Sequence, residues 1–352
     1  YLKMQETSGK LTAFLSLNKV VVLIFVISLT TSLCVHFDSL GRYLLSQTDS
    51  MGYYQYLPTW FCEGELLPDT YVVRLENGNP LSIFSFGVAI LQTPFFLVGH
   101  WFASVFGYST AGYSQPYALA QLVSTSFYLA FSVWLLGKHL AVKFSKNVVI
   151  FSVLAIYLGT NLYYYSSFDA GMSHTYNFFL FALLILTYQK LFSTKKGIYL
   201  VILGITIGLL TLVKPYNLLG LLWIVPFSKS KWNESWQLIR KNILMFFLAL
   251  FLACSLLFSQ MFYWFLVSGN FLLFSYGTKG EGFNWTSPEL IKVLFSVQNG
   301  WFIYTPLMFL SFIGIGIMLK SKDASGLKIA IILVLIYYII SSWWAWWFGG
   351  AF

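Results

Sequence analysis

Charged residues are scarce in this sequence: Asp, Glu, Lys and Arg together make up 9% of the 352 residues, whereas 58% are hydrophobic. Water-soluble globular chains are typically about one quarter charged, so a soluble fold could not cover this much apolar side chain. The composition therefore predicts an all-α polytopic membrane protein. The net charge of +9 does not indicate a nucleic-acid partner, because the basic residues lie in short clusters between apolar runs.

Cysteine is also rare, with three residues in the whole chain. Cys34 and Cys254 fall inside apolar runs and Cys62 stands in a loop, so no Cys-x-x-Cys spacing of a metal site is present. The acids of the expected outer loops are not clustered closely enough to indicate a divalent cation. We therefore predict no metal site and no resident cofactor from these residues, and leave divalent-metal dependence open.

The ends of the chain carry two further expectations. The first apolar run, 19–35, is longer than a signal-peptide core and lacks an Ala-x-Ala cleavage site, which indicates an uncleaved anchor. The chain starts at Tyr1 and stops at Phe352 in the middle of an aromatic motif. We therefore expect both ends to be incomplete, with a C-terminal region missing.

Long apolar runs define the expected architecture, because a helix needs about 20 mainly apolar residues to cross the hydrocarbon core. The runs predict about nine transmembrane helices in a single domain over 1–352. They lie near 19–36, 117–137, 148–166, 175–190, 197–213, 216–228, 243–266, 303–319 and 327–343. A further run at 82–106 is long enough to be a tenth, and the topology depends on how it is treated.

The charge distribution decides between the two treatments of 82–106. If this run does not change sides, 16 of the 21 Lys and Arg fall on the N-terminal face and nine of the twelve acids on the other. The positive-inside rule then favours an interfacial or re-entrant 82–106 and a cytoplasmic N-terminus. Pro94, which interrupts the run, agrees with a broken juxtamembrane helix. The outer loops are then 37–116, with its own juxtamembrane helices, and 268–304.

The stretch after the first apolar run contains the first candidate catalyst, Asp49. A carboxylate under a partly apolar lid can have its pKa raised and accept a proton from an attacking hydroxyl. The alternative is a helix cap, because Asp is a favoured residue before a first turn. Tyr53 and Tyr54 follow in an aromatic run suited to a bilayer surface, and we include both as candidate substrate contacts.

Two further outer turns carry ionisable side chains. Asp169 and His174 lie at the turn between two expected spans, where acids and histidines are costly and are functional candidates. Their alternatives are a helix-start acid and an interfacial histidine. Lys214 stands at the apex of a short apolar hairpin without a local acid, which suits a lipid-linked phosphate. Its alternative is a lysine whose stem lies along apolar surface.

The second outer loop and the C-terminal segment are rich in glycine, polar and aromatic residues. Lys279 and Glu281 lie in the run Tyr-Gly-Thr-Lys-Gly-Glu-Gly-Phe, a composition seen in sugar-binding surfaces and also in ordinary turns. Trp344 and Trp346 belong to Trp-Trp-Ala-Trp-Trp-Phe-Gly-Gly, which is dense enough for carbohydrate stacking. An interfacial aromatic belt accounts for some of these tryptophans.

This order of features resembles the GT-C superfamily of membrane glycosyltransferases, in particular the branch with protein O-mannosyltransferases and the lipid A aminoarabinose transferase. Asp49 matches the family's first-loop acid, although Ser50 stands where a second acid is usual, and Asp169 matches the acid of the second outer turn. The run Leu-Thr-Leu-Val-Lys-Pro ending at Pro215 resembles the family's Leu-Thr-Lys-Gly-Pro turn, with the lysine displaced and the glycine missing. Gly-Asn-Pro-Leu at 78–81 resembles its Pro-Pro-Leu element. The run Met-Ser-His-Thr-Tyr at 172–176 and the Trp-rich run are similar to a bacterial subgroup.

The resemblance implies a GT-C-like helical bundle in a bacterial inner membrane with a periplasmic active site. The implied reaction transfers a sugar from a polyprenyl-phosphate donor to a hydroxyl acceptor, with Asp49 as the base and Lys214 on the departing lipid phosphate. Asp169 and His174 would position donor or acceptor. The rivals are a non-catalytic membrane subunit of a larger assembly and a lipid or sugar transporter. The nearly charge-free spans argue against transport.

Overall fold

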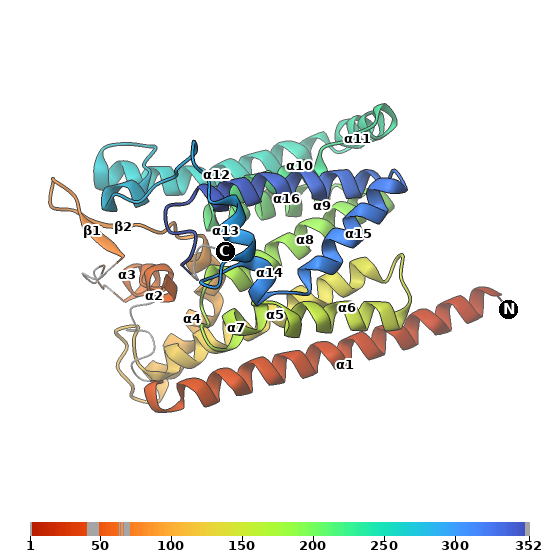
Figure 1. Ribbon diagram of the computed structural model, residues 1–352. Helices are drawn as coiled ribbons and strands as arrows, with labels where there is room; N and C mark the ends of the chain where they lie inside the picture. Colours follow the sequence, from red (N-terminus) through yellow and green to blue (C-terminus); the bar gives the residue numbers. More distant parts are fainter. Residues whose placement is uncertain (1, 41–48, 63, 65, 67–70, 349–352) are drawn as a thin grey trace. The chain divides into compact units, whose positions relative to one another are not determined.

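The computed structural model describes residues 2–40, 49–62, 64, 66 and 71–348 (Figure 1). The fold is mostly helical, and six helices of the described residues are long and apolar enough to cross a membrane. The expectation of a polytopic, helical membrane protein is confirmed at that level. The chain forms two compact units, which are described separately. Unit 1 contains Tyr1–Leu67 and Phe86–Gln189, and unit 2 contains Pro68–Ser85 and Lys190–Phe352.

Unit 1 is a helical bundle centred on one long helix. Its helices are α1 (Leu2–His36), the 3-10 turn η1 (Phe37–Ser39), α2 (Asp49–Tyr54), α3 (Tyr56–Phe61), α4 (Gly87–Val105), α5 (Gln115–Leu140), α6 (Lys146–Gly159), α7 (Leu162–Ser167) and the first part of α8 (Ser173–Thr194). Helix α5 begins after Ser114 in an extended conformation, with Pro116 in its first turn and Lys138 in its last. Both placements favour the helix, because proline fits a first turn and a cation complements the C-terminal dipole.

The core of unit 1 joins α1, α5, α6 and α7. Its fully buried members pack around the middle of α5; they are Ile24, Leu129, Val133, Val153, Tyr157 and Leu162. Serine hydroxyls add polar contacts between the helices. Ser28 of α1 lies 3.1 Å from the Ser126 hydroxyl and donates to the Ser166 carbonyl at 2.9 Å, and Ser32 donates to the Ser167 carbonyl at 3.0 Å. Small hydroxyl residues let helices in lipid approach closely and hydrogen-bond across the interface.

Helix α4 corresponds to the run whose role decides the predicted topology. It contains Pro94, and it packs against the first half of α5. The Tyr128 hydroxyl donates to the Leu91 carbonyl at 2.8 Å, and a Cβ at Gly99 would lie 3.0 Å from the Pro116 carbonyl oxygen. By length and composition α4 is one of the six helices able to cross a membrane. Its interfacial placement therefore stays a prediction.

Unit 2 combines long apolar helices with short elements. These are β1 (Val72–Arg74), β2 (Pro80–Ser82), α9 (Ile198–Val213), η3 (Pro215–Gly220), α10 (Leu221–Ile224), α11 (Lys229–Lys241), α12 (Ile243–Ser268), η4 (Ser275–Lys279), α13 (Leu290–Phe295), α14 (Trp301–Tyr304), α15 (Met308–Lys320) and α16 (Ala324–Ser342). Strands β1 and β2 pair antiparallel, with Val73 opposite Leu81.

Helices α9 and α12 pack in parallel along a glycine seam. An added Cβ would lie 2.6 Å from the Asn242 side chain at Gly197, 2.3 Å from the Ala249 carbonyl oxygen at Gly204, and 2.9 Å from Leu256 at Gly208. The residue numbers of these contacts increase along α12 as they increase along α9, so the two helices run in the same direction. Since every position is too close for a side chain, glycine is what allows the two backbones to approach.

Two of the basic loops predicted for one membrane face meet within unit 2. Lys195, which follows α8, forms an ion pair with Glu234 of α11, and Lys231 bonds the same carboxylate at 2.8 Å. Helix α11 carries exposed Trp232 and Trp236 among its basic residues. This contact between 190–196 and 229–241 is what the charge-based topology requires of loops on one side.

The predicted spans differ from the observed helices in length. Five of the nine coincide with the long helices α1, α5, α8, α12 and α16, and α4 is the sixth long helix. The run 148–166 divides into α6 and α7, 216–228 contains only short helical turns, and 303–319 contains α14 and the short α15. The four shorter apolar helices leave the count of nine, like the single domain over 1–352, a prediction.

Candidate functional site

Asp49 and Asp169 come together in unit 1. Asp49 is the first residue of α2, rather than the residue before it, and Asp169 lies in the turn between α7 and α8. Burial raises the pKa of the Asp169 carboxyl to about 6, and the negative charge of Asp49 adds to the rise. Two acids from separate outer segments of the predicted topology thus interact electrostatically. Thr48, which precedes Asp49 in the sequence, lies outside the described residues.

Gly171 shapes the turn that carries Asp169. Its φ of +90° is open to glycine and strained for other residues, and its amide donates to the Thr125 hydroxyl of α5 at 2.9 Å. An added Cβ would lie 2.1 Å from the Gln121 side-chain nitrogen and 3.1 Å from the Ser50 Cβ. The acid turn therefore packs directly on α5 and on the residue after Asp49. This packing accounts for the proximity of the two acids.

His174 and Tyr165 extend the pair into a cluster. Their rings stack with centroids 3.9 Å apart and an interplanar angle of 13°. The charges of Asp169 and Asp49 both act on Tyr165, which is buried. We call Asp49, Asp169, Tyr165 and His174 the acid cluster. Sequence patterns pointed to three of its members and missed Tyr165, which lies three residues before the turn without a motif of its own.

The two tyrosines after Asp49 have different partners. The Tyr53 hydroxyl donates to the Ser173 hydroxyl at 3.3 Å, which links α2 to the start of α8 beside the acid cluster. The Tyr54 hydroxyl donates to the Gly112 carbonyl at 2.5 Å, and its ring packs against Phe96 with centroids 5.9 Å apart. Tyr53 therefore lies beside the cluster, whereas Tyr54 is used in packing the 106–114 loop onto α2.

Buried amides and hydroxyls line the helix side of the acid turn. Gln92 of α4 donates to the Gly171 carbonyl at 3.5 Å and to the Tyr176 hydroxyl at 3.1 Å. Gln121 is 4% exposed, and its side-chain oxygen has no hydrogen-bond partner among the described residues. Sequence reasoning did not select these residues. The sequence does contain a signal for a buried polar face here, because Gln121, Ser124 and Thr125 lie about one helical turn apart within an apolar span.

Lys214 belongs to unit 2, where it follows the last residue of α9. Its ammonium lies 5.8 Å from the centroid of the Tyr216 ring. Asn217 closes the turn by donating from its side chain to the Leu210 carbonyl at 2.9 Å, and Ser85 donates to the Leu212 carbonyl. Within the described part of the chain no carboxylate forms an ion pair with Lys214. The turn thus holds a half-buried cation beside a tyrosine ring, without an ion-pair partner among the described residues.

The strand pair β1–β2 and the second outer loop meet within unit 2. Lys279 places its ammonium 5.5 Å from the centroid of the Tyr71 ring, and the Tyr276 ring packs edge-on against Trp343 at 5.6 Å. The amide of Glu281 donates to the Tyr276 carbonyl at 3.3 Å. The loop 275–285 therefore connects the strand pair β1–β2 with the aromatic C-terminal segment.

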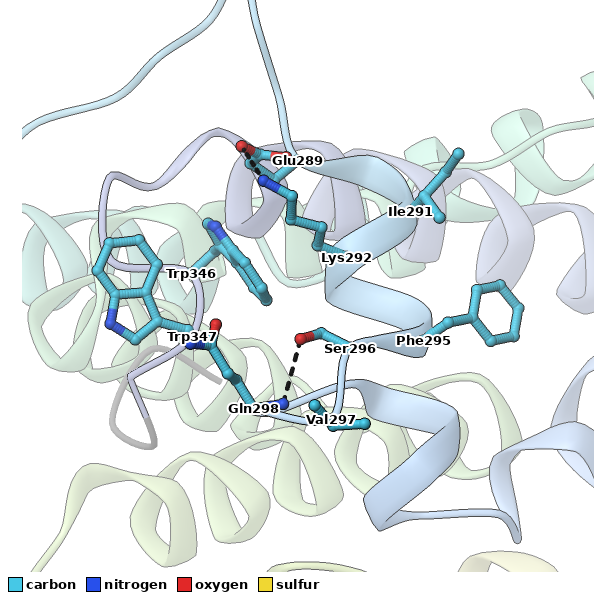
Figure 2. A pocket seen from close by; sticks show the side chains of 9 residues that line it. All are labelled: Glu289, Ile291, Lys292, Phe295, Ser296, Val297, Gln298, Trp346 and Trp347. Atoms are coloured by element: carbon cyan, nitrogen blue, oxygen red, sulfur yellow. Dashed lines mark hydrogen bonds and ion pairs between the residues drawn. The ribbon is translucent and has the colours of Figure 1, made fainter.

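That aromatic segment forms one wall of an open cavity of about 680 Å³ (Figure 2). Its lining residues are Glu289, Ile291, Lys292, Phe295, Ser296, Val297, Gln298, Trp346 and Trp347. Trp346, one of the two candidate tryptophans, is in this lining. Trp344 lies outside it, with its ring edge-on to Trp347 at 6.0 Å. Gly349 and Gly350, which end the sequence motif, lie outside the described residues.

No protein-family model, curated protein or solved structure matches this chain.

The chemistry of the two regions follows from their own residues. The acid cluster offers a carboxyl whose pKa is raised to about 6 beside a second carboxyl, which is an arrangement suited to accepting and holding protons. No three His, Cys, Asp or Glu side chains of the described residues gather as metal ligands. Lys214 offers a cation, and the unit 2 cavity offers aromatic faces with polar groups around them.

Proposed function

We propose that this chain is a membrane glycosyltransferase that moves a sugar from a polyprenyl-phosphate donor to a hydroxyl acceptor. The observation that supports this most is the interaction of Asp49 with Asp169 in the acid cluster. Both acids fall on outer turns in a topology that was chosen from the positions of Lys and Arg, without regard to Asp49 or Asp169 as catalysts. The bacterial inner membrane, with the acid cluster on its periplasmic side and the N-terminus in the cytoplasm, is the location that we propose.

In this proposal Asp49 acts as the general base. Its carboxylate takes the proton of the acceptor hydroxyl while the acceptor oxygen forms a bond to the anomeric carbon of the donor. The bond from the anomeric carbon to the phosphate oxygen breaks, and the lipid phosphate leaves with the electron pair. Asp169, with its pKa near 6, positions the acceptor or donor through a hydrogen bond, and His174 holds Tyr165 beside both acids.

Lys214 is proposed to bind the phosphate of the donor. A fixed cation is most useful against a charge that grows in the transition state, and the leaving lipid phosphate gains such a charge. The absence of an ion pair at Lys214 among the described residues supports this role, because the ammonium is not already neutralised by a carboxylate. Membrane lipid is the environment from which the donor would enter.

Transfer by purified protein in lipid nanodiscs tests the proposal. Polyprenyl-phosphate glucose, mannose and aminoarabinose labelled in the sugar are incubated with the wild type, Asp49→Asn and Asp38→Asn. Asp38 is the matched control, because it is an exposed acid of the same predicted loop. We expect Asp49→Asn to lose sugar release or transfer by about 100-fold or more, as for removal of a general base, and Asp38→Asn to keep wild-type activity.

Two outcomes would overturn this function. Equal turnover by Asp49→Asn and the wild type would remove Asp49 from the mechanism. No turnover of any donor by membranes that contain the intact protein and the native acceptor pool would favour a non-catalytic membrane subunit. Circular dichroism and thermal unfolding of each variant show whether a loss of activity reflects chemistry or folding.

A further inference from the structure

The cavity of unit 2 is built by one short helix, one tight turn and the tryptophan segment. Lys292 and Ser296 stand one helical turn apart on the side of α13 that faces the tryptophans (Figure 2). After α13 the chain turns sharply, and the Gly300 amide donates to the Ser296 carbonyl at 2.7 Å. A Cβ at Gly300 would lie 2.5 Å from that same carbonyl oxygen, so the turn that presents Gln298 needs glycine there.

The opposite wall is held in place by backbone pairing. Phe283 forms a bridge with Trp343, and the Trp344 amide donates to the Gly282 carbonyl at 3.0 Å. Trp346 is 5% exposed, so it is a buried wall of the cavity, whereas Trp347 is 42% exposed. Their rings are nearly perpendicular, at 84° with centroids 5.7 Å apart. Of the two indoles that line the cavity, Trp347 is therefore the more accessible.

The charges around the cavity balance. The Lys292 ammonium donates to the Glu289 carboxylate at 2.9 Å and lies 5.9 Å from the centroid of the Trp346 ring. An anion bound here would meet Glu289, and a cation would meet Lys292. A neutral ligand with hydroxyl groups meets neither penalty, because the carboxylate accepts, the ammonium donates, and the exposed amide of Gln298 does both. The volume of about 680 Å³ lies in the range of small-molecule sites.

We propose that this cavity binds the pyranose ring of a saccharide, with Trp347 stacked on one face of the sugar and Glu289, Lys292 and Gln298 on its hydroxyls. The C–H bonds on one face of a pyranose carry a slight positive charge, which suits the negative face of an indole ring. The binding site uses residues of unit 2 alone. It does not depend on the proposed transfer reaction.

The apolar side chains in the lining of the cavity indicate where a lipid tail would lie. Ile291 and Phe295 project from the other side of α13, away from the tryptophans (Figure 2), and Val297 lies in the turn below. Ile291 is 77% exposed and Val297 81% exposed. A free saccharide and the head group of a glycolipid share the same ring chemistry. They differ in whether an alkyl chain gains from this rim.

Calorimetric titration of the full chain in nanodiscs tests the site with four soluble probes. These are methyl β-glucoside, methyl α-mannoside, hexyl β-glucoside and hexyl phosphate. We expect saturable binding of at least one glycoside, and binding about tenfold weaker in Trp347→Ala, the size expected for loss of one stacking contact. Trp236→Ala is the matched control, because Trp236 is 50% exposed on α11 of the same unit but lies outside the cavity.

Gln298→Ala removes an exposed side chain, so it keeps the test informative if Trp347→Ala unfolds. We expect this variant to bind glycosides about threefold more weakly, as for loss of one neutral hydrogen bond. Tighter binding of hexyl than methyl β-glucoside would identify a glycolipid head group, and equal binding a free saccharide.

The proposal is overturned if no glycoside binds, if hexyl phosphate binds as tightly as hexyl β-glucoside, or if Trp236→Ala weakens binding as much as Trp347→Ala. The same titration with Asp49→Asn separates this proposal from the proposed function. Glycoside binding that survives in a variant without transfer shows a site that is independent of the reaction.

Discussion

The acid cluster of unit 1 and the cavity of unit 2 are built by opposite means. In the acid cluster, the turn around Gly171 is closed against α5 and α2, and its polar groups are buried among other helices. In the cavity, the polar groups lie on a short helix and a surface turn, and the ion pair of Glu289 and Lys292 is largely exposed. The geometry of the acid cluster depends on close packing among helices, whereas that of the cavity depends on backbone hydrogen bonds, within the turn 296–300 and between 282–283 and 343–344.

This difference has an energetic consequence. Protein interiors transmit the effect of an added atom, because there is no free volume to absorb it. An exposed turn can accommodate a changed side chain, and an exposed ion pair contributes little to stability. We therefore expect substitutions near the acid cluster to alter both folding and the carboxyl groups, and substitutions around the cavity to alter binding alone.

The largest expected effect comes from Gly171→Ala, compared with Gly280→Ala. Both glycines have positive φ, +90° and +74°, so both variants carry a similar backbone penalty of about 1–2 kcal/mol. At Gly280 nothing lies within 4 Å of the new Cβ, but at Gly171 the Gln121 nitrogen lies at 2.1 Å. Overpacking should add about 1–3 kcal/mol to the cost at Gly171. Thermal unfolding of both variants in one detergent measures the difference.

An equal fall in Tm for the two glycine variants would show that Gln121 moves aside freely. The acid turn would then be no more constrained than the unit 2 loop, and the contrast between the regions would fail.

An intermediate effect is expected from Asp169→Asn, and it depends on pH. The folded-state pKa is raised from 3.8 to about 6, so the protonated carboxyl stabilises the fold fully below about pH 4, and this contribution is lost as the pH rises through 6. The asparagine variant does not ionise. We expect its Tm to exceed that of the wild type by about 2 °C or more at pH 7.5, and the gap to narrow by pH 4.5.

Asp38→Asn is again the control, because this exposed acid lies in η1, after the last residue of α1, and its charge is not among the causes of the raised pKa of Asp169. Its Tm difference from the wild type should be the same at both pH values. A pH-independent difference for Asp169→Asn as well would contradict the raised pKa of Asp169, of which burial is the larger cause and the charge of Asp49 the smaller.

The smallest expected effect on stability comes from Glu289→Gln in the cavity. The side chains of Glu289 and Lys292 are 41% and 58% exposed, and such surface pairs contribute about 0–1 kcal/mol. We expect a Tm within about 1 °C of the wild type. Lys231→Gln, which weakens a second exposed pair in unit 2, should behave alike. A clear loss of stability in Glu289→Gln alone would mean that the cavity pair supports the fold.

Apolar length was enough to predict most of the long helices from the sequence. The main error in continuity was the run 148–166. Thr160 donates from its hydroxyl to the Ile156 carbonyl at 2.7 Å, and accepts from the Leu162 amide at 3.2 Å. A threonine side chain can replace backbone partners at a helix end, so α6 stops there and α7 starts anew. A hydropathy pattern does not register this substitution of hydrogen-bond partners.

The site residues also fall into those that the sequence indicates and those that only the fold brings together. Asp49 and Asp169 could be selected because an acid beside an apolar run is unusual. Tyr165 and Gln121 could not, because their role comes from a close approach between α5 and a turn far along the chain. Glu289 and Lys292 are three residues apart and could have been paired from the sequence. That Trp346 and Trp347 lie opposite them depends on the backbone pairing of Trp343, which has no local signal.

The glycine seam of unit 2 also constrains the order of assembly during synthesis. Because α9 and α12 are parallel, they cannot form as a hairpin of two consecutive helices. When α9 leaves the ribosome, its flat glycine face has no partner until the segment 214–242 has been made and α12 follows. An unpaired face of this kind is exposed to lipid or to membrane chaperones in the meantime. A substitution at Gly204 would therefore slow or prevent the assembly of the helices during synthesis, before it affected the mature protein.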